Sequence, residues 1–231
     1  MRLGGFQKLT LIDYPGKIAT TVFTVSCSFR CPFCHNPELV LNSDFPALNE
    51  MEKEFFEFLK KRKGKLEGVC ITGGEPTIQM DIIEFIKKIR EMGFLVKLDS
   101  NGTRPDVLKK IINQKLVDFI AMDIKNSPEK YSQTTGVKAD IERIKLSVDL
   151  IMNSGIDYEF RTTVVPGIHS EKDFEKIAIW INGAKAYYLQ EFRDLKILDP
   201  KIKKKIKGNN LNLEKIEKKI KKHFGKTGIR R

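Results

Sequence analysis

Three cysteines in the segment SCSFRCPFCHN are the clearest candidates for chemistry in this chain. Cys27, Cys31 and Cys34 follow the spacing C-x3-C-x2-C, so one short loop can wrap a single centre. Thiolates are soft ligands that suit zinc, copper(I) and iron–sulfur clusters. Disulfides among cysteines this close would be strained, which favours reduced thiolates. The spacing therefore predicts a metal centre with three cysteine ligands.

Two kinds of centre fit three cysteines. A structural zinc site needs a fourth ligand, which the adjacent His35 could supply. Neighbouring residues rarely both reach one metal, which weighs against zinc. A 4Fe–4S cluster on three cysteines leaves one iron open to a small molecule.

A second motif, ITGGEP at residues 71–76, follows a predicted strand. Gly73 and Gly74 would let the backbone approach a ligand closely, and the Glu75 carboxylate suits an ammonium group. The alternative is an ordinary strand-to-helix turn with Pro76 in the first helical turn.

The two motifs, in this order, resemble those of radical S-adenosylmethionine (SAM) enzymes, whose signature C-x3-C-x-Φ-C has its aromatic position at Phe33. The resemblance implies a 4Fe–4S cluster on Cys27, Cys31 and Cys34, with the open iron chelated by the amino and carboxylate groups of SAM. Reductive cleavage of SAM then gives a 5'-deoxyadenosyl radical. The residues expected beside the cofactors are Phe33, Cys34, His35, Gly73, Gly74 and Glu75.

The segments LDSNG and MDIK resemble parts of glycyl-radical-enzyme activating enzymes. The resemblance implies that Lys125 and nearby polar groups contact SAM, and that Asp99 and Asp123 help to form a monovalent-cation site beside its carboxylate. The charges of these residues agree with a cation site, because two aspartates would repel the SAM carboxylate unless a cation lay between them. Plain capping of strand ends is the alternative. The expected contacts here are Asp99, Ser100, Asn101, Asp123, Ile124 and Lys125.

Arg161 lies in FRTTVVPG, which resembles the R-x-x-V-V-P-G run of the same activating enzymes, where the arginine faces SAM. An inward-pointing arginine needs an anionic partner, and a buried structural ion pair is the alternative. Cys70 lies inside a predicted strand and is interpreted as a core residue. Trp180 is interpreted as packing, and His169 receives no assignment.

Short apolar runs alternate with amphipathic stretches along the chain. Strands are predicted at 19–25, 68–72, 94–99, 119–122, 157–165 and 186–189, and helices at 49–63, 78–92, 105–114, 140–153 and 172–182. This alternation predicts an α/β fold of parallel strands with right-handed crossovers, and the resemblance implies a partial (β/α)6 barrel. The polar motifs fall at or near the carboxyl ends of strands, where parallel α/β folds hold their chemistry.

The formal charge of +12 is concentrated at the end of the sequence. Residues 201–231 hold 13 Lys and Arg against two Glu, so residues 1–200 are nearly neutral. We therefore predict a core domain over 1–200 and a lysine-rich helical tail over 201–231. The tail is either a solvated helix or a docking surface for an acidic partner or nucleic acid. Nucleic acid is disfavoured because the tail lacks the interleaved aromatics of a stacking platform.

The sequence has neither a signal-peptide pattern nor an apolar run of about 18 residues, which favours the cytoplasm and no membrane partner. One spare cysteine is too few for an auxiliary cluster.

The segment QKLTLIDYPGK resembles the longer form of anaerobic ribonucleoside-triphosphate reductase activating proteins. This implies transfer of a hydrogen atom from a backbone glycine of a partner enzyme, most simply anaerobic ribonucleotide reductase, with ferredoxin or flavodoxin as electron donor. The alternative is a radical SAM enzyme for a small molecule, such as a nucleoside or deazapurine precursor.

Overall fold

A computed structural model describes residues 1–41 and 50–231. Within them, one sheet holds eight strands in chain order. The strands are β1 (Leu3–Thr10), β2 (Ala19–Thr24), β3 (Gly68–Gly73), β4 (Leu95–Ser100), β5 (Phe119–Asp123), β6 (Asp157–Val164), β7 (Ala186–Glu191) and β8 (Lys226–Arg230).

The strands β2 to β8 pair in parallel, and β1 pairs antiparallel with β2. All six predicted strands are confirmed as β2 to β7. They follow buried apolar runs; in β3, for example, Val69 and Ile71 are fully buried. Runs of this kind are typical of parallel strands covered by helices. The predicted α/β class with a partial barrel of parallel strands is confirmed.

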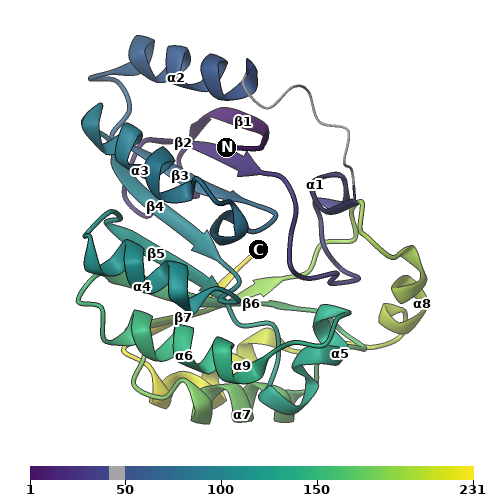
Figure 1. The fold of residues 1–231 in the computed structure, drawn as a ribbon. Helices are drawn as coiled ribbons and strands as arrows, with labels where there is room; N and C mark the ends of the chain where they lie inside the picture. The colour runs from purple at the N-terminus through teal and green to yellow at the C-terminus, as the bar shows by residue number, and fades with distance from the viewer. Residues whose placement is uncertain (42–49) are drawn as a thin grey trace.

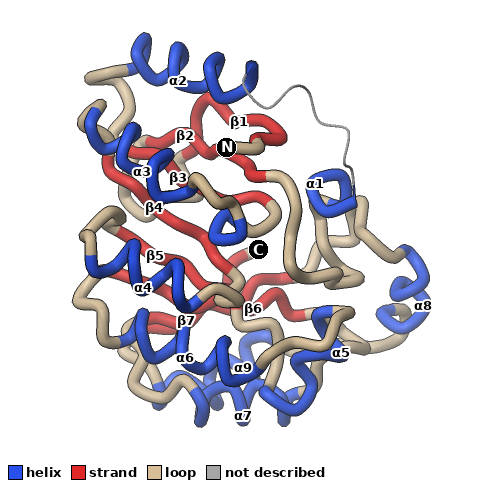
Figure 2. The backbone as a smooth tube through the Cα atoms, in the orientation of Figure 1, coloured by secondary structure: helices blue, strands red, loops and turns tan. Residues whose placement is uncertain are grey.

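Helices cover the outer side of the curved sheet (Figure 1). The longer helices are α2 (Glu50–Arg62), α3 (Ile82–Glu91), α4 (Pro105–Asn113), α6 (Ile141–Met152), α7 (Glu171–Trp180) and α9 (Leu213–Ile220). The shorter ones are α1 (Pro37–Leu41), α5 (Tyr131–Thr135) and α8 (Lys203–Ile206), with single 3₁₀ turns at 76–78, 128–130, 200–202 and 221–223. Figure 2 shows the strands inside this helical layer.

The five predicted helices are confirmed as α2, α3, α4, α6 and α7, although residue 49 of the first prediction lies outside the described residues. The helix α3 illustrates why they form. Ile82, Phe85, Ile86 and Ile89 recur with helical spacing and are buried against the sheet and α2. The helix ends just before Gly93, which adopts φ 90°.

The lysine-rich tail forms more than the predicted helix. Its predicted apolar stripe is confirmed in α9, where Leu213, Ile216 and Ile220 are buried and the helix packs against α7. The tail also forms β8, which pairs in parallel with β7 and thus joins the main sheet. Neither β8 nor β1 was predicted. The division into domains at residue 200 stays a prediction. No described helix is long and apolar enough to span a membrane.

Candidate active site

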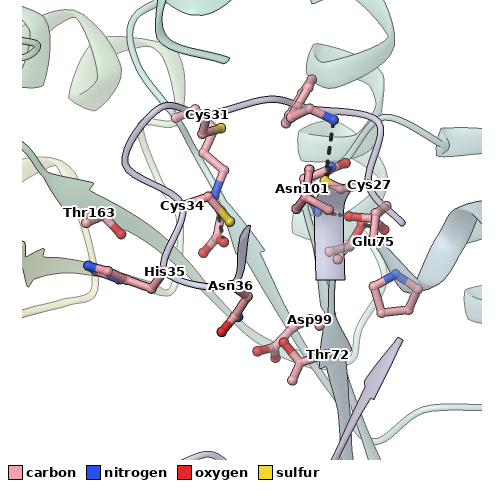
Figure 3. A pocket seen from close by; sticks show the side chains of 18 of the residues that line it. Cys27, Cys31, Cys34, His35, Asn36, Thr72, Glu75, Asp99, Asn101 and Thr163 are labelled. Atoms are coloured by element: carbon pink, nitrogen blue, oxygen red, sulfur yellow. Dashed lines mark hydrogen bonds and ion pairs between the residues drawn. The ribbon is translucent and has the colours of Figure 1, made fainter. Parts of the chain in front are cut away.

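All the predicted site residues except Ile124 and Arg161 meet in a cavity at the carboxyl ends of β2 to β5 (Figure 3). The strand ends supply its polar walls, and the loop after β2 supplies the cysteines. Its lining residues are Cys27, Phe29, Cys31, Phe33, Cys34, His35, Asn36, Val40, Thr72, Gly73, Gly74, Glu75, Pro76, Asp99, Ser100, Asn101, Asp123, Lys125 and Thr163.

The cysteine loop is held by its backbone. The chain turns after β2 at Ser26, which adopts φ 72° and donates its N–H to the carbonyl of Leu39 in α1 at 2.7 Å. The N–H of Arg30 donates to the carbonyl of Thr135 at the end of α5 at 2.8 Å. Further along, the carbonyl of Cys34 accepts a hydrogen bond from the N–H of Leu198 at 3.1 Å. Because the backbone carries these contacts, the cysteine side chains are left to line the cavity.

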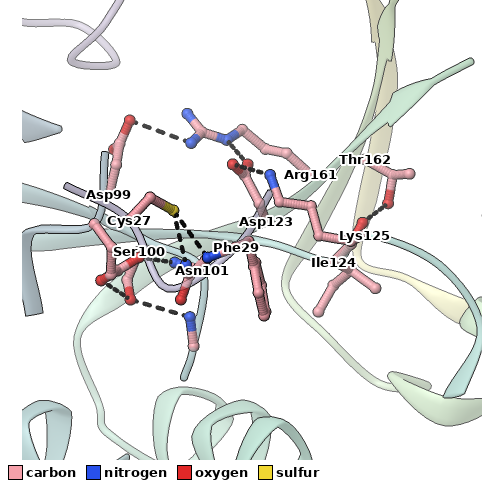
Figure 4. A network of polar contacts seen from close by, with 12 residues as sticks. Cys27, Phe29, Asp99, Ser100, Asn101, Asp123, Ile124, Lys125, Arg161 and Thr162 are labelled. Carbon is pink, nitrogen blue, oxygen red and sulfur yellow. Dashed lines mark hydrogen bonds and ion pairs between the residues drawn. The ribbon is translucent and has the colours of Figure 1, made fainter. Parts of the chain in front are cut away.

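The cysteines need a metal to become thiolates. Burial raises the pKa of Cys27 to about 11 and that of Cys31 to about 12. Both are therefore protonated near neutral pH unless a metal ion displaces the proton. The backbone N–H of Phe29 and the amide nitrogen of Asn101 lie 3.4 and 3.6 Å from the Cys27 sulfur, where they can stabilise a thiolate (Figure 4).

The donor set fits a cluster better than a single zinc ion. His35 lines the cavity, but its Nε2 lies 2.8 Å from the carbonyl oxygen of Arg193 and its ring stacks on Phe192. The described His, Cys, Asp and Glu side chains form no group of three around a single-ion position. In a cubane each cysteine ligates a different iron, so the sulfurs need not converge on one point. Cys27, Cys31 and Cys34 are thus the residues that would hold a 4Fe–4S cluster.

The two glycines of the GGEP turn are required by neighbouring backbone. A Cβ atom on Gly73 would lie 2.3 Å from the Thr24 nitrogen, and one on Gly74 would lie 1.9 Å from the Ser26 oxygen. The N–H groups of Gly74 and Glu75 donate to the carbonyls of Thr24 and Ser26 at 2.9 and 2.8 Å. The motif in the sequence indicates close approach of a ligand as the reason for these glycines. The structure adds another: the turn lies directly against the segment that leads to Cys27.

Glu75 ties two strand ends together. Its buried carboxylate accepts hydrogen bonds from the N–H of Thr77 at 3.1 Å, the hydroxyl of Ser100 at 2.9 Å and the N–H of Asn101 at 2.6 Å. Burial raises the pKa of this carboxyl group. Glu75 therefore holds the turn after β3 against the turn after β4. Its contact with a SAM amino group stays a prediction.

A chain of partly buried charges lies beside the cavity (Figure 4). Arg161 of β6 donates from Nη2 to Asp99 at 3.2 Å and from Nε to Asp123 at 3.0 Å. Lys125 donates to Asp123 at 2.9 Å, and Lys97 donates to Asp99. The register that pairs Asp123 with Arg161 brings the chain together. Arg161 thus forms the ion pair that was the alternative interpretation, and it does not line this cavity.

The charged partners fix the ionisation of both aspartates. Burial alone would raise the pKa of Asp99, but Arg161 and Lys97 outweigh it and hold the pKa below its ordinary value of 3.8. Lys125 and Arg161 do the same for Asp123. The pKa of Lys125 is raised because Asp123 outweighs the effect of burial. These three side chains are therefore charged at neutral pH.

Ile124 was predicted as a cofactor contact, but the structure places it in the apolar core. It is fully buried and absent from the cavity lining, while its neighbours Asp123 and Lys125 line the cavity. Successive residues point to opposite sides of an extended chain, which explains the difference.

Several lining residues were missed by sequence reasoning. Phe29, Asn36, Thr72 and Pro76 flank the motifs, which is a usable signal. Thr163 lies two residues after Arg161, whereas Val40 carries no signal in the sequence. His169 was also missed. Its Nε2 lies 2.8 Å from the backbone carbonyl oxygen of Lys125, a contact that positions the Lys125 backbone.

The fold and the site define an α/β protein with three cysteines that could hold a metal centre at the carboxyl edge of a partial barrel. Comparison with known proteins agrees. The profile of the Radical SAM superfamily matches residues 21–181. A Methanocaldococcus jannaschii protein named "putative glycyl-radical enzyme activating enzyme" is 33% identical over 233 residues, with 99% of this chain and 95% of that protein covered.

A pyruvate formate-lyase-activating enzyme of Clostridium pasteurianum is 27% identical over 177 residues, covering 74% of this chain and 72% of that enzyme. The crystal structure of Streptococcus suis SuiB bound to S-adenosylmethionine has a TM-score of 0.66 at 14% identity, covering 88% of this chain and 48% of SuiB. This last likeness concerns the fold. The chain belongs to the radical SAM superfamily, which implies a 4Fe–4S cluster and SAM as cofactors.

Proposed function

We propose that this protein is a glycyl-radical-enzyme activating enzyme of the cytoplasm, with anaerobic ribonucleotide reductase as its partner. The similarity of nearly the whole chain to a relative with the activating-enzyme name supports the general activity. The order of the CHNP, GGEP, DSNGT and MDIK motifs supports it as well.

A second cavity next to the first is the observation that supports a protein as the substrate. It has a volume of about 530 Å³ and is lined by Arg161, whose guanidinium binds Asp99 and Asp123 at the edge of the first cavity. Ile12 lines the second cavity and is 86% exposed, with the exposed Leu11 beside it. An apolar lip beside an open cavity suits an extended segment of another polypeptide.

The residues of the site then have distinct roles. When bound, the cluster and SAM supply the radical that takes a hydrogen atom from the glycine Cα, with one electron from ferredoxin or flavodoxin. Cys27, Cys31 and Cys34 hold the cluster. Lys125 offers a cation to the SAM carboxylate, and Glu75 keeps the two turns around the cavity in register.

The experiment is anaerobic. The reconstituted enzyme is mixed with reductant, SAM and purified anaerobic ribonucleotide reductase, and electron paramagnetic resonance is used to look for a glycyl radical doublet matched by 5'-deoxyadenosine. The doublet should disappear in Cys31→Ala. Cys70→Ala is the matched control for iron content, because Cys70 is fully buried and does not itself line the cavity, so its loss should leave the cluster in place.

A second candidate function is a radical SAM reaction on a small phosphorylated molecule. Arg193, Arg230 and Arg231 line the second cavity, and arginine recognises phosphate groups well. Deoxyadenosine without a doublet would favour this candidate or another glycyl radical enzyme. Absence of both cluster and deoxyadenosine would contradict both candidates.

A further inference from the structure

The carboxylates expected to bind a monovalent cation already have protein partners. The oxygens of Asp99 contact Lys97 and Arg161, and those of Asp123 contact Arg161 and Lys125. Each of the four oxygens thus faces an ammonium or guanidinium group. A bound Na⁺ or K⁺ needs several oxygen ligands with free lone pairs directed at it. The side chains present do not fit that requirement.

Lys97 is the unusual member of this set. Its side chain is 1% exposed, so its charge is removed from water and depends on a buried partner. Residues 97 and 99 are two apart on β4, so both face the interior of the curved sheet. The Cys70 sulfur lies 3.6 Å from the Lys97 ammonium, and the Phe119 ring centre lies 6.0 Å from it. Lys97 therefore has no path to solvent that would free Asp99 for an external cation.

The charges around this chain also leave no need for another cation. The neighbouring Glu159 is 3% exposed and pairs with Arg230 at 2.6 Å, with an Arg161 nitrogen 4.0 Å away. Among the described side chains of this network, four cations face three carboxylates. The one excess positive charge suits the carboxylate of SAM. An added Na⁺ or K⁺ would instead meet repulsion from Arg161 and the two lysines.

We propose that Lys97 is a built-in counter-ion that takes the place of a monovalent cation, so that SAM binding by this enzyme is independent of Na⁺ and K⁺. Lys97 acts through Asp99 and does not line the cofactor cavity, so it is a positioning residue. The inference concerns the cofactor site and does not depend on which substrate the enzyme activates.

The test measures SAM affinity of the reconstituted enzyme by anaerobic equilibrium dialysis, without any partner protein. KCl, NaCl and tetramethylammonium chloride are compared at equal ionic strength, because tetramethylammonium is too large to occupy a cation site. The wild-type dissociation constants should agree within about twofold. Lys97→Met should bind SAM weakly in tetramethylammonium chloride and regain about tenfold in KCl, since K⁺ can then take the vacated position.

Three further checks keep the result clear. Lys130→Met is the matched control, because Lys130 also pairs with a buried carboxylate, Asp173, at 2.8 Å but neither residue lines the cavity, and its SAM affinity should not depend on the salt. Melting temperatures in the same salts give a readout that does not need SAM. A second variant, Lys97→Gln, covers poor folding of Lys97→Met.

Either of two outcomes would overturn the proposal. One is a tenfold or greater preference of the wild-type enzyme for K⁺ or Na⁺ over tetramethylammonium. The other is Lys97 variants that are as indifferent to salt as the wild type. If neither variant folds in any salt, the wild-type comparison decides. All these measurements are made without a partner protein, so they stay valid even if the proposed activase function is wrong.

Discussion

The acidic side chains of this site have pKa values that are shifted in opposite directions. Glu75 is buried and satisfied by hydrogen-bond donors, whereas Asp99 and Asp123 are partly buried and paired with cations. The first environment raises the pKa of the carboxyl group and the second lowers it. Carboxyl groups at one edge of the sheet thus contribute to stability with opposite dependence on pH.

This contrast predicts a pH dependence of stability. A raised pKa means that folded Glu75 binds its proton more tightly than the unfolded chain, so its contribution falls as pH rises above 4.5. The contribution of Asp99 and Asp123 is complete above 3.8 and is lost as pH falls below it. Urea unfolding between pH 4.5 and neutrality measures how the free energy of unfolding changes with pH. This slope should be more negative for the wild type than for Glu75→Gln, by up to about 1.4 kcal/mol per pH unit. Equal slopes would contradict this assignment.

Gly74 offers a second test at the level of one residue. In Gly74→Ala the new methyl group would meet the Ser26 carbonyl oxygen and push the turn away from the cysteine loop. We expect a loss of about 3 kcal/mol or more in the free energy of unfolding and lower iron content after reconstitution. Gly183→Ala is the control, because its methyl group meets no atom closer than 4.0 Å and adds only backbone strain of about 1–2 kcal/mol. Full iron content in Gly74→Ala would show that the turn does not position the loop.

At the level of elements, β8 ties the tail to the site. Arg230 donates from both terminal nitrogens to the buried Glu159 of β6, at 2.7 and 2.6 Å, and its guanidinium carbon lies 4.0 Å from the Tyr188 ring centre. Such a fork-shaped pair with a buried carboxylate is costly to break, because the carboxylate loses its strongest partner.

Arg230→Gln should therefore lower the free energy of unfolding by about 2 kcal/mol. Arg231→Gln is the matched control. Arg231 is 61% exposed and pairs with Glu214 and Glu191 at the surface, so its loss should cost less than about 0.5 kcal/mol. Urea denaturation of both variants measures the difference, and similar losses would argue against a structural role of the Glu159 pair.

The sequence predicted the inner elements well and the edges poorly. Strands β2 to β7 stand out because short runs rich in apolar or β-branched residues fill them and alternate with helical stretches. Strand β1 contains Gly4 and Gly5, and β8 is a short KTGIR segment around Gly228, so neither shows a strand pattern. Their pairing comes from tertiary contacts with β2 and β7 that no local pattern encodes.

The site residues likewise divide into those that the sequence predicted and those that it missed. Residues beside the motifs were found because they are close in sequence to the cysteines and glycines. Lys97 and Glu159 were missed because a charge inside a strand normally faces solvent, whereas here the interior of the curved sheet is polar. Whether Arg161 met a cofactor or an acid depended on the pairing register, which the sequence does not reveal.

At the scale of the whole molecule, the positive charge is partly used inside the fold. Lys215 and Lys219 on α9 pair with Glu171 and Glu175 on α7, so the tail helix docks on the acidic side of its neighbour. Removal of residues 201–231 would take away this helix and β8 together. Deletion of the tail would therefore test stability and not the role of its charge.

Charge substitutions are the cleaner test. Lys204, Lys218 and Lys222 are exposed and form no ion pair in the described structure. Changing all three to Gln should alter the free energy of unfolding by less than about 1 kcal/mol and leave SAM affinity unchanged. Calorimetry and equilibrium dialysis provide the two measurements. A lower rate of glycyl radical formation at unchanged SAM affinity would identify the lysines as a docking surface.

The pair between Glu159 and Arg230 also sets an order of events during protein synthesis. Strand β6 leaves the ribosome well before β8, so a nascent chain has Glu159 in place before Arg230 exists. Until β8 joins β7, the cationic partner of Glu159 is the more distant Arg161 nitrogen, 4.0 Å away, and a carboxylate with so weak a partner favours hydration. The last strand of the chain thus completes the charge pairing of the polar interior, so a chain that stops before β8 has Glu159 without its two-pronged partner.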